Sequence, residues 1–182
     1  WLTDRKQRSY TVECRAASSA AHTYGKNLVS AEAFTASFTF RQMPCDLKLL
    51  GDWAWTEGSN HYVRHLYIHQ PDERKAGMNA WFGTDFNRHS TWFHSMKSYF
   101  DYVRRSCALL QSGHNVADIA YFIGEDVPKM TGPMVPKLPA GYQYDFINAE
   151  VLKDARVVNG RIVLSSGQSS SCLLRKLCGP KC

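Results

Sequence analysis

The 182-residue sequence has no apolar run long enough to cross a membrane. A membrane-spanning helix needs about 20 predominantly apolar residues, whereas the longest uninterrupted apolar stretches here are only a few residues long. The sequence also lacks an initiator methionine, since it opens with Trp1, and no signal-peptide pattern follows. We therefore predict no membrane partner and expect the chain to be a piece of a longer protein.

A dense basic stripe, typical of a nucleic-acid-binding face, is also missing. Lys and Arg number 22 against 16 Asp and Glu, which gives a net charge of +6 and a pI near 9.0. The basic residues are scattered along the chain, and charges of both signs are normal on a solvated surface. We predict no nucleic-acid partner.

The six cysteines include no Cys-x-x-Cys pair and no Cys/His spacing of a zinc module. Three of them lie in the last eleven residues. Because residues 168–182 are rich in Ser, Cys and Lys and differ from everything before them, we interpret them as an atypical tail, non-native or disordered, and assign them no function.

Hydrophobic periodicity predicts alternating helices and strands as far as Gly113. The expected elements are a helix over 11–24, a strand over 28–34, a helix over 47–55, a strand over 60–70 and a long helix over 90–111. The loop between the last two, residues 71–88, is long enough to be functional. Alternation of this kind predicts parallel βα units of an α/β fold.

The character of the sequence changes after Gly113. We expect a buried strand over 116–124, a Pro- and Gly-rich connector to residue 141, and a strand-to-helix junction over 144–152. Asn159-Gly160 between two apolar pairs is a strong hairpin signal. Two domains are therefore predicted, over 1–113 and 114–167.

Polar residues at the carboxyl ends of parallel strands are the candidates for chemistry. Glu32 lies near the end of one predicted strand, and Gln70 ends the next. Each acid has a plainer alternative, since Glu32 could be a solvated surface residue and Glu57 could simply terminate a helix.

Three histidines, His61, His65 and His69, recur at every fourth residue and so share one face of a strand or a helix. A zinc site of this kind usually needs a further ligand at a defined spacing, which is missing. We favour barrel-lining or substrate-contacting roles for these histidines, with His65 and His69 as the candidate substrate contacts.

Aromatic side chains near these strands could stack on a sugar ring. Trp81 and Phe82 lie in the long loop, together with Asn87. Trp92 and Phe93 belong to the predicted long helix, where aromatic residues are more often part of a core.

Several stretches resemble glycoside hydrolase family 106, a family of large α-L-rhamnosidases. They occur in the family's order and spacing over residues 24–35, 57–63, 69–71, 87–93, 100–113, 116–126 and 138–152. The sequence departs from the family pattern at Phe93, where a second Trp is usual, and after residue 165. The resemblance implies the later part of a (β/α)8 TIM-type barrel over 1–113, followed by the start of a second α/β domain.

The resemblance also implies a mechanism and a substrate. It implies inverting, calcium-assisted hydrolysis of a rhamnose-containing plant or microbial glycan by two glutamates, with the acid upstream of this chain. Glu57 maps to the base and Glu32 to a calcium-binding or sugar-contacting glutamate, with exchangeable roles. His65, His69, Gln70, Trp81, Asn87 and Trp92 are the expected substrate contacts. We expect a periplasmic or extracellular enzyme.

Two further expectations concern the isolated chain. Few oxygen donors accompany Glu32, and the nearest candidates are Glu57, Asn60 and Asp85. The isolated chain should therefore bind calcium weakly or not at all. The alternative function is a non-catalytic carbohydrate-binding or structural fragment.

Overall fold

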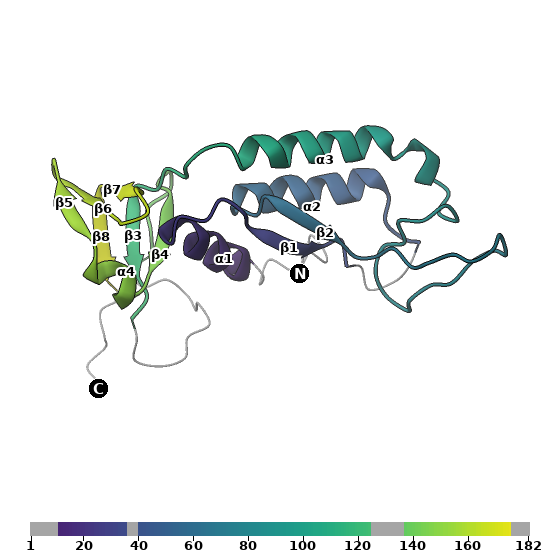
Figure 1. The fold of residues 1–182 in the computed structure, drawn as a ribbon, viewed down its shortest axis with the longest axis horizontal. Helices are drawn as coiled ribbons and strands as arrows, with labels where there is room; N and C mark the ends of the chain where they lie inside the picture. The colour runs from purple at the N-terminus through teal and green to yellow at the C-terminus, as the bar shows by residue number, and fades with distance from the viewer. Residues whose placement is uncertain (1–10, 36–39, 125–136, 176–182) are drawn as a thin grey trace. The chain divides into compact units, whose positions relative to one another are not determined.

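The computed structural model describes residues 11–35, 40–124 and 137–175, which divide into two compact units (Figure 1). The first unit comprises Ser30–Gln111, and the second joins Thr11–Val29 to the residues from Ser112 onward. The first helix, α1 (Thr11–Thr23), therefore belongs with the second unit, although the sequence analysis placed it in the first domain. No helix among the described residues is long and apolar enough to span a membrane.

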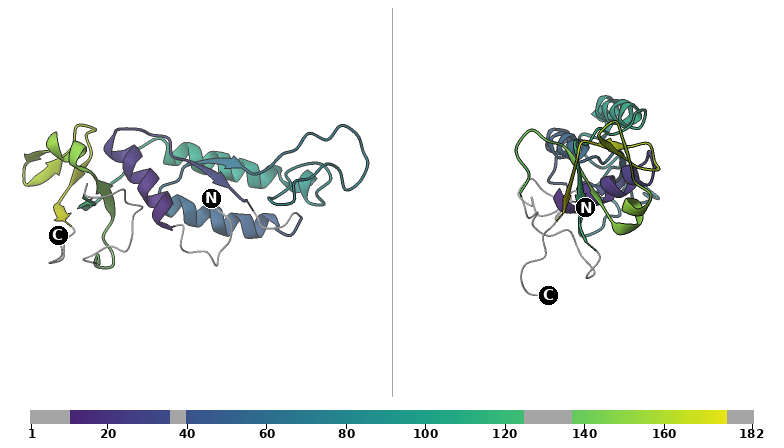
Figure 2. Two further views of the ribbon diagram at one scale, coloured as in Figure 1. Left: turned by 90° about the horizontal axis from the view of Figure 1, so that it is seen from below. Right: turned by 90° about the vertical axis from the view of Figure 1, so that its left-hand side faces the viewer.

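The first unit is built on one β-α-β motif. Strands β1 (Ser30–Ala33) and β2 (His61–Arg64) are parallel neighbours, and helix α2 (Pro44–Thr56) connects them. A 3-10 turn, η2 (Phe93–Ser95), then leads into helix α3 (Lys97–Leu110). Figures 1 and 2 show α2 and α3 running alongside each other. The predicted parallel βα arrangement is thus present in this unit.

One face of this two-stranded sheet is covered by the two helices. Tyr62 stacks on Trp55 of α2, with ring centroids 5.7 Å apart, and donates its hydroxyl hydrogen to the Gly51 carbonyl at 2.6 Å. Arg64 lies two residues further along β2, with its guanidinium 4.5 Å from the Phe100 ring centre in α3. Alternation along the strands then places Glu32 and Val63, which are register partners, on the opposite face.

Phe34 is the centre of the aromatic core in the first unit. It is fully buried, and its ring centroid lies 5.6 Å from that of Tyr62, 6.2 Å from that of Phe86 and 6.3 Å from that of Tyr99. These rings come from three separate stretches of chain, so packing against Phe34 fixes how the segments after β1 and β2 are placed.

The second unit contains a parallel three-stranded sheet in the order β4-β3-β8. Its strands are β3 (Ile119–Phe122), β4 (Tyr144–Ile147) and β8 (Cys172–Arg175). Helix α1 packs beside β4, where the Phe146 amide donates to the Ser19 hydroxyl at 2.9 Å. This contact explains why α1 clusters with a strand more than 100 residues later in the chain.

A short helix and a small antiparallel sheet complete the second unit. Helix α4 (Ala149–Lys153) starts at Asn148, whose side chain accepts the Val151 amide hydrogen at 3.0 Å. Strands β5 (Arg156–Val158) and β6 (Arg161–Val163) form the predicted hairpin, and β7 (Ser169–Ser170) pairs with β6. Asn159 and Gly160 turn the hairpin with φ values of 50° and 73°, as a primed turn requires.

The structure corrects the expectation of a disordered tail for residues 168–175. Gln168 is buried, β7 extends the small sheet, and β8 pairs in parallel with β3. Ser-rich composition hid these strands because their stability comes from backbone pairing with partners distant in sequence. Residues 176–182 and most of the Pro-rich connector, 125–136, lie outside the described residues.

The predicted strand over 60–70 is also shorter than expected. Only His61–Arg64 pairs as β2, and the chain then enters the long loop.

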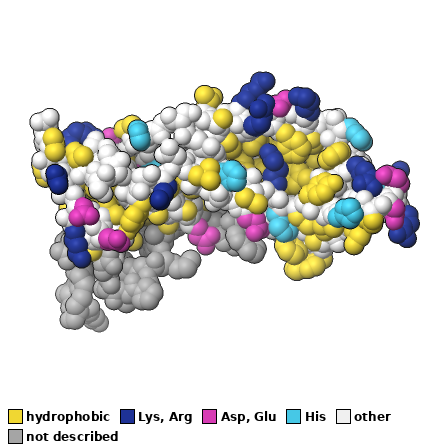
Figure 3. All heavy atoms as spheres, viewed as in Figure 1, with side chains coloured by type: hydrophobic (Ala, Val, Ile, Leu, Met, Phe, Trp, Pro, Cys, Tyr) yellow, Lys and Arg dark blue, Asp and Glu magenta, His cyan; other side chains and the backbone are white. Residues whose placement is uncertain are grey.

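On the face shown in Figure 3, Lys and Arg side chains occur in several separate groups.

Candidate functional site

The candidate site lies at the edge of the sheet formed by the carboxyl ends of β1 and β2. The His65 amide donates to the Ala33 carbonyl at 2.9 Å, which continues the pairing beyond β2. Leu66 then donates to the Thr84 carbonyl at 2.9 Å and accepts from the Phe86 amide at 3.0 Å. This is the parallel-strand pattern, so residues 84–86 lie beside the end of β2 as a third extended segment.

Glu32 lies near this edge, on the face opposite the helices. Its carboxylate is half-buried and accepts a hydrogen bond from the Thr35 hydroxyl at 2.6 Å. Two residues earlier on the same face, Ser30 Oγ lies 2.9 Å from His61 Nδ1. Glu32 is therefore oriented by one neighbour and keeps further lone pairs for other contacts.

The backbone just after Glu32 is strained. Phe34 has φ = 69°, a left-handed conformation that is unusual for a bulky residue. The Thr84 hydroxyl donates to the Phe34 carbonyl at 2.8 Å and helps to hold this conformation. Strain of this kind is concentrated at functional sites, where the surrounding structure maintains it.

Glu57 does not accompany Glu32. It is the C-cap residue of α2, and β2 begins only four residues later, at His61. Because a helix between parallel strands returns the chain to their amino ends, Glu57 lies at the opposite end of β2 from the edge near Glu32. Asn60 immediately precedes β2, so it also lies at the amino end.

Three rings, those of His65, Phe82 and Trp81, contact one another in series next to the carboxyl end of β2, and we call them the aromatic column. His65 stacks on Phe82 with ring centroids 5.0 Å apart, and Phe82 contacts Trp81 at 4.4 Å. Trp81 is 84% exposed. A Cβ added to Gly83 would lie 2.6 Å from His65 Nδ1, so glycine is required for the histidine ring to lie this close to the loop. Of the predicted aromatic contacts, Trp81 presents the most open ring.

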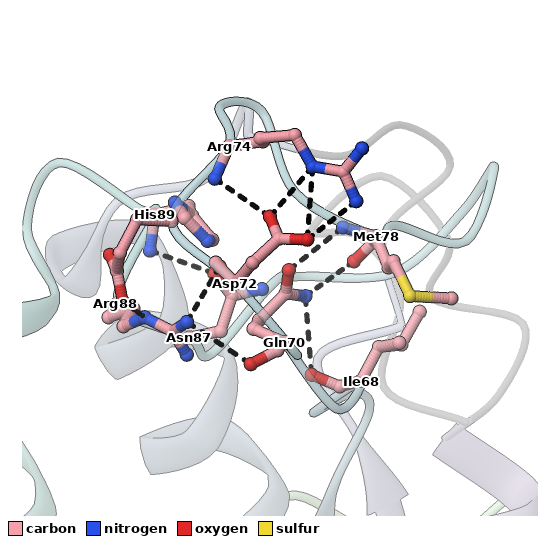
Figure 4. A network of polar contacts seen from close by, with 9 residues as sticks. Ile68, Gln70, Asp72, Arg74, Met78, Asn87, Arg88 and His89 are labelled. Atoms are coloured by element: carbon pink, nitrogen blue, oxygen red, sulfur yellow. Dashed lines mark hydrogen bonds and ion pairs between the residues drawn. The ribbon is translucent and has the colours of Figure 1, made fainter.

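Gln70 holds the long loop together (Figure 4). Its side-chain oxygen accepts the Met78 amide hydrogen at 2.8 Å, and its nitrogen donates to the Met78 carbonyl at 2.6 Å and to the Ile68 carbonyl at 3.2 Å. The side chain is buried. These contacts give Gln70 a structural role, and they occupy the groups through which it was expected to bind substrate.

Arg88 reinforces the same loop from the other side. Its Nη2 donates to the Gln70 carbonyl at 3.1 Å and to the Asp72 carbonyl at 2.7 Å, while its Nε donates to Glu73 at 2.8 Å. Asp72 is also paired with Arg74, which lowers the pKa of the Asp72 carboxyl. The loop is therefore fixed by a network of its own polar side chains.

The remaining predicted contacts differ in exposure. Asn87 is fully buried and accepts the His89 amide hydrogen at 2.9 Å through Oδ1. Trp92 is half-buried, donates to the Gln42 carbonyl at 3.2 Å and packs against Phe86 at 5.9 Å, which is a core role. His69 is exposed.

The sequence suggested Asp85 only as one of three nearby oxygen donors for calcium, and its role as a buried acid at this edge was missed. It is 1% exposed, and neither carboxyl oxygen has a hydrogen-bond partner among the described residues. Burial raises the pKa of the Asp85 carboxyl, and the nearby His65 opposes that shift. The signal available in the sequence was an acid with aromatic residues on both sides, Phe82 before it and Phe86 after it, but the local sequence carried no measure of its burial.

The calcium donors expected from the sequence do not gather into one cluster among the described residues. No group of three or more His, Cys, Asp or Glu side chains able to hold a metal occurs among them. Glu57 and Asn60 lie at the other end of β2, so the expected donors do not gather around Glu32. No step of the chemistry is therefore assigned to calcium.

The chain is similar to known glycoside hydrolases. A family model described as alpha-L-rhamnosidase matches residues 1–176, including β7 and β8. The solved structure of a rhamnosidase from Novosphingobium sp. PP1Y matches with a TM-score of 0.82 and 37% identity, covering 91% of this chain and 16% of that one. A Formosa agariphila protein named "Putative beta-glucuronidase" is 41% identical over 152 residues, which is 82% of this chain and 13% of the relative.

This chain thus spans only about one sixth or less of the length of these relatives. Its family match nevertheless extends across both units of the described structure. The chain therefore belongs to glycoside hydrolase family 106, the family described as α-L-rhamnosidase.

Proposed function

We propose that this chain contributes one sector of the active site of an α-L-rhamnosidase, with β1 and β2 as neighbouring strands of its catalytic barrel. The observation that carries the proposal is the placement of Glu32. Its half-buried carboxylate lies at the carboxyl end of a parallel β-α-β unit, on the face that the helices leave open. Active sites of (β/α)8 enzymes are built at that end of the strands.

Glu32 is the carboxylate that we assign to the reaction. An inverting glycosidase needs a base that activates water and an acid about 6.5 to 9.5 Å away from it. Glu32 accepts one hydrogen bond from Thr35 and has lone pairs left for water or a sugar hydroxyl. The acid would come from another part of the longer protein. Glu57 remains the alternative base, but its position at the amino end of β2 favours Glu32.

The aromatic column supports a sugar substrate. Trp81 offers an exposed ring face, backed by Phe82 and His65, on which a pyranose ring can stack. Rhamnose has no carboxylate, whereas a glucuronide would need a cation. Near this edge, Arg64 lies over Phe100 on the helix side, and Arg88 is bonded to Glu73 and to the loop backbone. These arrangements favour a neutral sugar.

The test uses the full-length protein that contains this segment, with Glu32→Gln and Glu57→Gln as matched variants. Hydrolysis of an aryl α-L-rhamnoside is expected to fall by about 10²- to 10⁴-fold in kcat for Glu32→Gln, as for loss of a general base. Glu57→Gln should retain most of the activity. The reverse result would move the base to Glu57, and turnover of an aryl β-D-glucuronide in place of the rhamnoside would refute the proposed specificity.

The isolated 182-residue chain should not hydrolyse either glycoside. The proposed acid lies outside it, so half of the carboxylate pair is missing. Measurable turnover that Glu32→Gln abolishes would show that this chain holds both groups, and the assignment of the acid to another segment would then be wrong.

A further inference from the structure

Asp85 is unusual because it is buried and neither of its carboxyl oxygens has a hydrogen-bond partner in the part of the chain that the structure describes. Burying an unpaired carboxyl is costly, and buried polar groups are normally hydrogen-bonded. Asp145 in the second unit follows that rule: its carboxylate is equally buried but is bonded to His22 at 2.9 Å, to Asn115 at 2.8 Å and to Gln168. Asp85 therefore requires an explanation that Asp145 does not.

Two further polar atoms close to Asp85 in the fold share its condition. Asn87 Nδ2 and His65 Nδ1 are buried and have no hydrogen-bond partner among the described residues. Their positions follow from the backbone. Leu66 bonds to the amide and carbonyl groups that flank Asp85, so Asp85 lies beside Leu66 and next to His65. Gly83 lies against His65 Nδ1 in turn.

The direction of the Asp85 side chain follows from that of its neighbour. Phe86 packs into the ring cluster of Phe34, Trp92 and Phe100. Side chains alternate along an extended segment, so Asp85 points away from that cluster, to the other side of the segment. Asn87 follows two residues later, where the chain begins to turn and the Ser90 amide donates to the Asn87 carbonyl. Two buried polar groups without a partner among the described residues thus lie two positions apart beside the end of β2.

The chemistry of this set restricts the partner. Asp85 provides at least one acceptor oxygen whether or not it is protonated, whereas Asn87 Nδ2 provides donor hydrogens and His65 Nδ1 can do either. A calcium ion would require oxygen ligands only, and an anion would require donors only. A hydroxyl group both donates and accepts, so it can satisfy Asp85 and Asn87 at once.

We propose that Asp85 and Asn87, beside His65, form a binding site for one hydroxyl group at the carboxyl end of β2. The hydroxyl can belong to an ordered water or to the sugar substrate, and only the second source rests on the proposed function. In either case Asp85 is a positioning residue, because it fixes the hydroxyl and the His65 ring beside Glu32's edge of the sheet.

Stability of the 182-residue chain tests the site independently of activity. Urea unfolding is measured for Asp85→Leu and Asp85→Asn near pH 4, where the raised pKa of the Asp85 carboxyl favours its protonated form. If a hydroxyl bridges the cluster, Asp85→Leu should lower the urea midpoint by about 1 M, because that bridge is lost and Asn87 is stranded. Asp85→Asn should lower it less, since an amide can still donate and accept.

An opposite shift would overturn the proposal. If the carboxyl is merely buried without any partner, replacing it with leucine or asparagine should leave the midpoint unchanged or raise it. Asp85→Asn keeps this test valid should Asp85→Leu fail to fold. Asp101→Asn, a change at an acid on the surface of α3, is the matched control and should shift the midpoint little.

A second arm identifies the source of the hydroxyl. The same unfolding curves are recorded with excess L-rhamnose, because a ligand that binds only the folded state raises its stability. If the hydroxyl belongs to the sugar, rhamnose should raise the urea midpoint of the wild-type chain and should bind Asp85→Asn with at least tenfold weaker affinity. Water predicts the same midpoint losses with and without rhamnose. Loss of glycosidase activity in Glu32→Gln is measured separately, so the proposed function can fail while this site stands.

Discussion

The two buried aspartates show how differently one side chain can be used. Asp145 is held by three donors from three separate segments, and it fixes α1 to the second unit through His22. Within the described stretches of the chain, the Asp85 carboxyl has no hydrogen-bond partner, and the hydrogen bonds of the backbone on either side of Asp85 hold it in place. A satisfied buried acid stabilises a fold, whereas an unsatisfied one indicates a place where a ligand or a water is bound.

The pH dependence of stability should distinguish Asp85 from a surface acid. Burial raises the pKa of Asp85, so its proton is held more tightly in the folded state than in the unfolded state. The stability that this proton binding adds to the folded state is complete below about pH 4, the ordinary pKa of an aspartate. It is lost as the pH rises through the raised pKa of Asp85. Relative to Asp85→Asn, the wild-type urea midpoint should fall as pH increases from about 4 to 7.

Asp101 provides the control of opposite sign. The hydrogen bond from Lys97 lowers the pKa of the Asp101 carboxyl, so its contribution is present above about pH 4 and is lost as pH falls. Asp101→Asn should therefore have a slightly lower urea midpoint than the wild type above about pH 4, and this difference should disappear in acid. A pH-independent difference between wild type and Asp85→Asn would show that Asp85 titrates normally.

At the scale of elements, local turn chemistry determines the hairpin and parallel pairing determines the candidate site. The β5–β6 turn depends on two consecutive residues with positive φ, which any reader of the sequence can expect from Asn-Gly. The β1–β2 edge depends on α2 returning the chain to the amino end of β2, and that is what separates Glu32 from Glu57.

Gly160→Ala should destabilise the hairpin. Alanine at φ = 73° is strained, at a cost of about 1 to 2 kcal/mol, although the space around Gly160 is open. Gly113→Ala is the matched control, because Gly113 also has open space around it but does not have a positive φ. It should be neutral or stabilising by about 0.4 to 1 kcal/mol. Urea unfolding of both variants checks the difference, and equal effects would contradict the assigned turn.

At the scale of the whole chain, sequence order and spatial grouping differ. Helix α1 precedes β1 directly but is bonded to β4 and to Asp145. The segment between Ser30 and Gln111 is therefore inserted between two parts of the second unit.

Amide hydrogen exchange of Asp145→Ala should reveal this grouping. Removing the carboxylate strands the donors of Asn115 and Gln168 and should cost about 3 kcal/mol. Exchange should accelerate in α1 and in the β4-β3-β8 sheet, with α2 and α3 changing much less. Acceleration in α2 together with α1, at the same rate, would mean that the chain unfolds as a single cooperative body.

Calcium titration tests whether this chain holds a complete calcium site. Because the described residues gather no group of three metal ligands, we expect calorimetry to detect no micromolar calcium binding by this chain. Micromolar binding that Glu32→Gln abolishes would show that a complete calcium site exists within the 182 residues.

The sequence by itself determined the α/β class, the order of most helices and strands, the Asn-Gly hairpin and the family. Each depends on local periodicity, on turn residues or on an ordered set of motifs. The tertiary structure decided what depends on contacts between distant residues. It grouped α1 with the second unit, paired the Ser-rich segment as strands and bonded the Gln70 side chain within the long loop. It also buried Asp85 with no hydrogen-bond partner for its carboxyl among the residues described. Pairing and burial arise from residues far apart in sequence, so no local pattern specifies them.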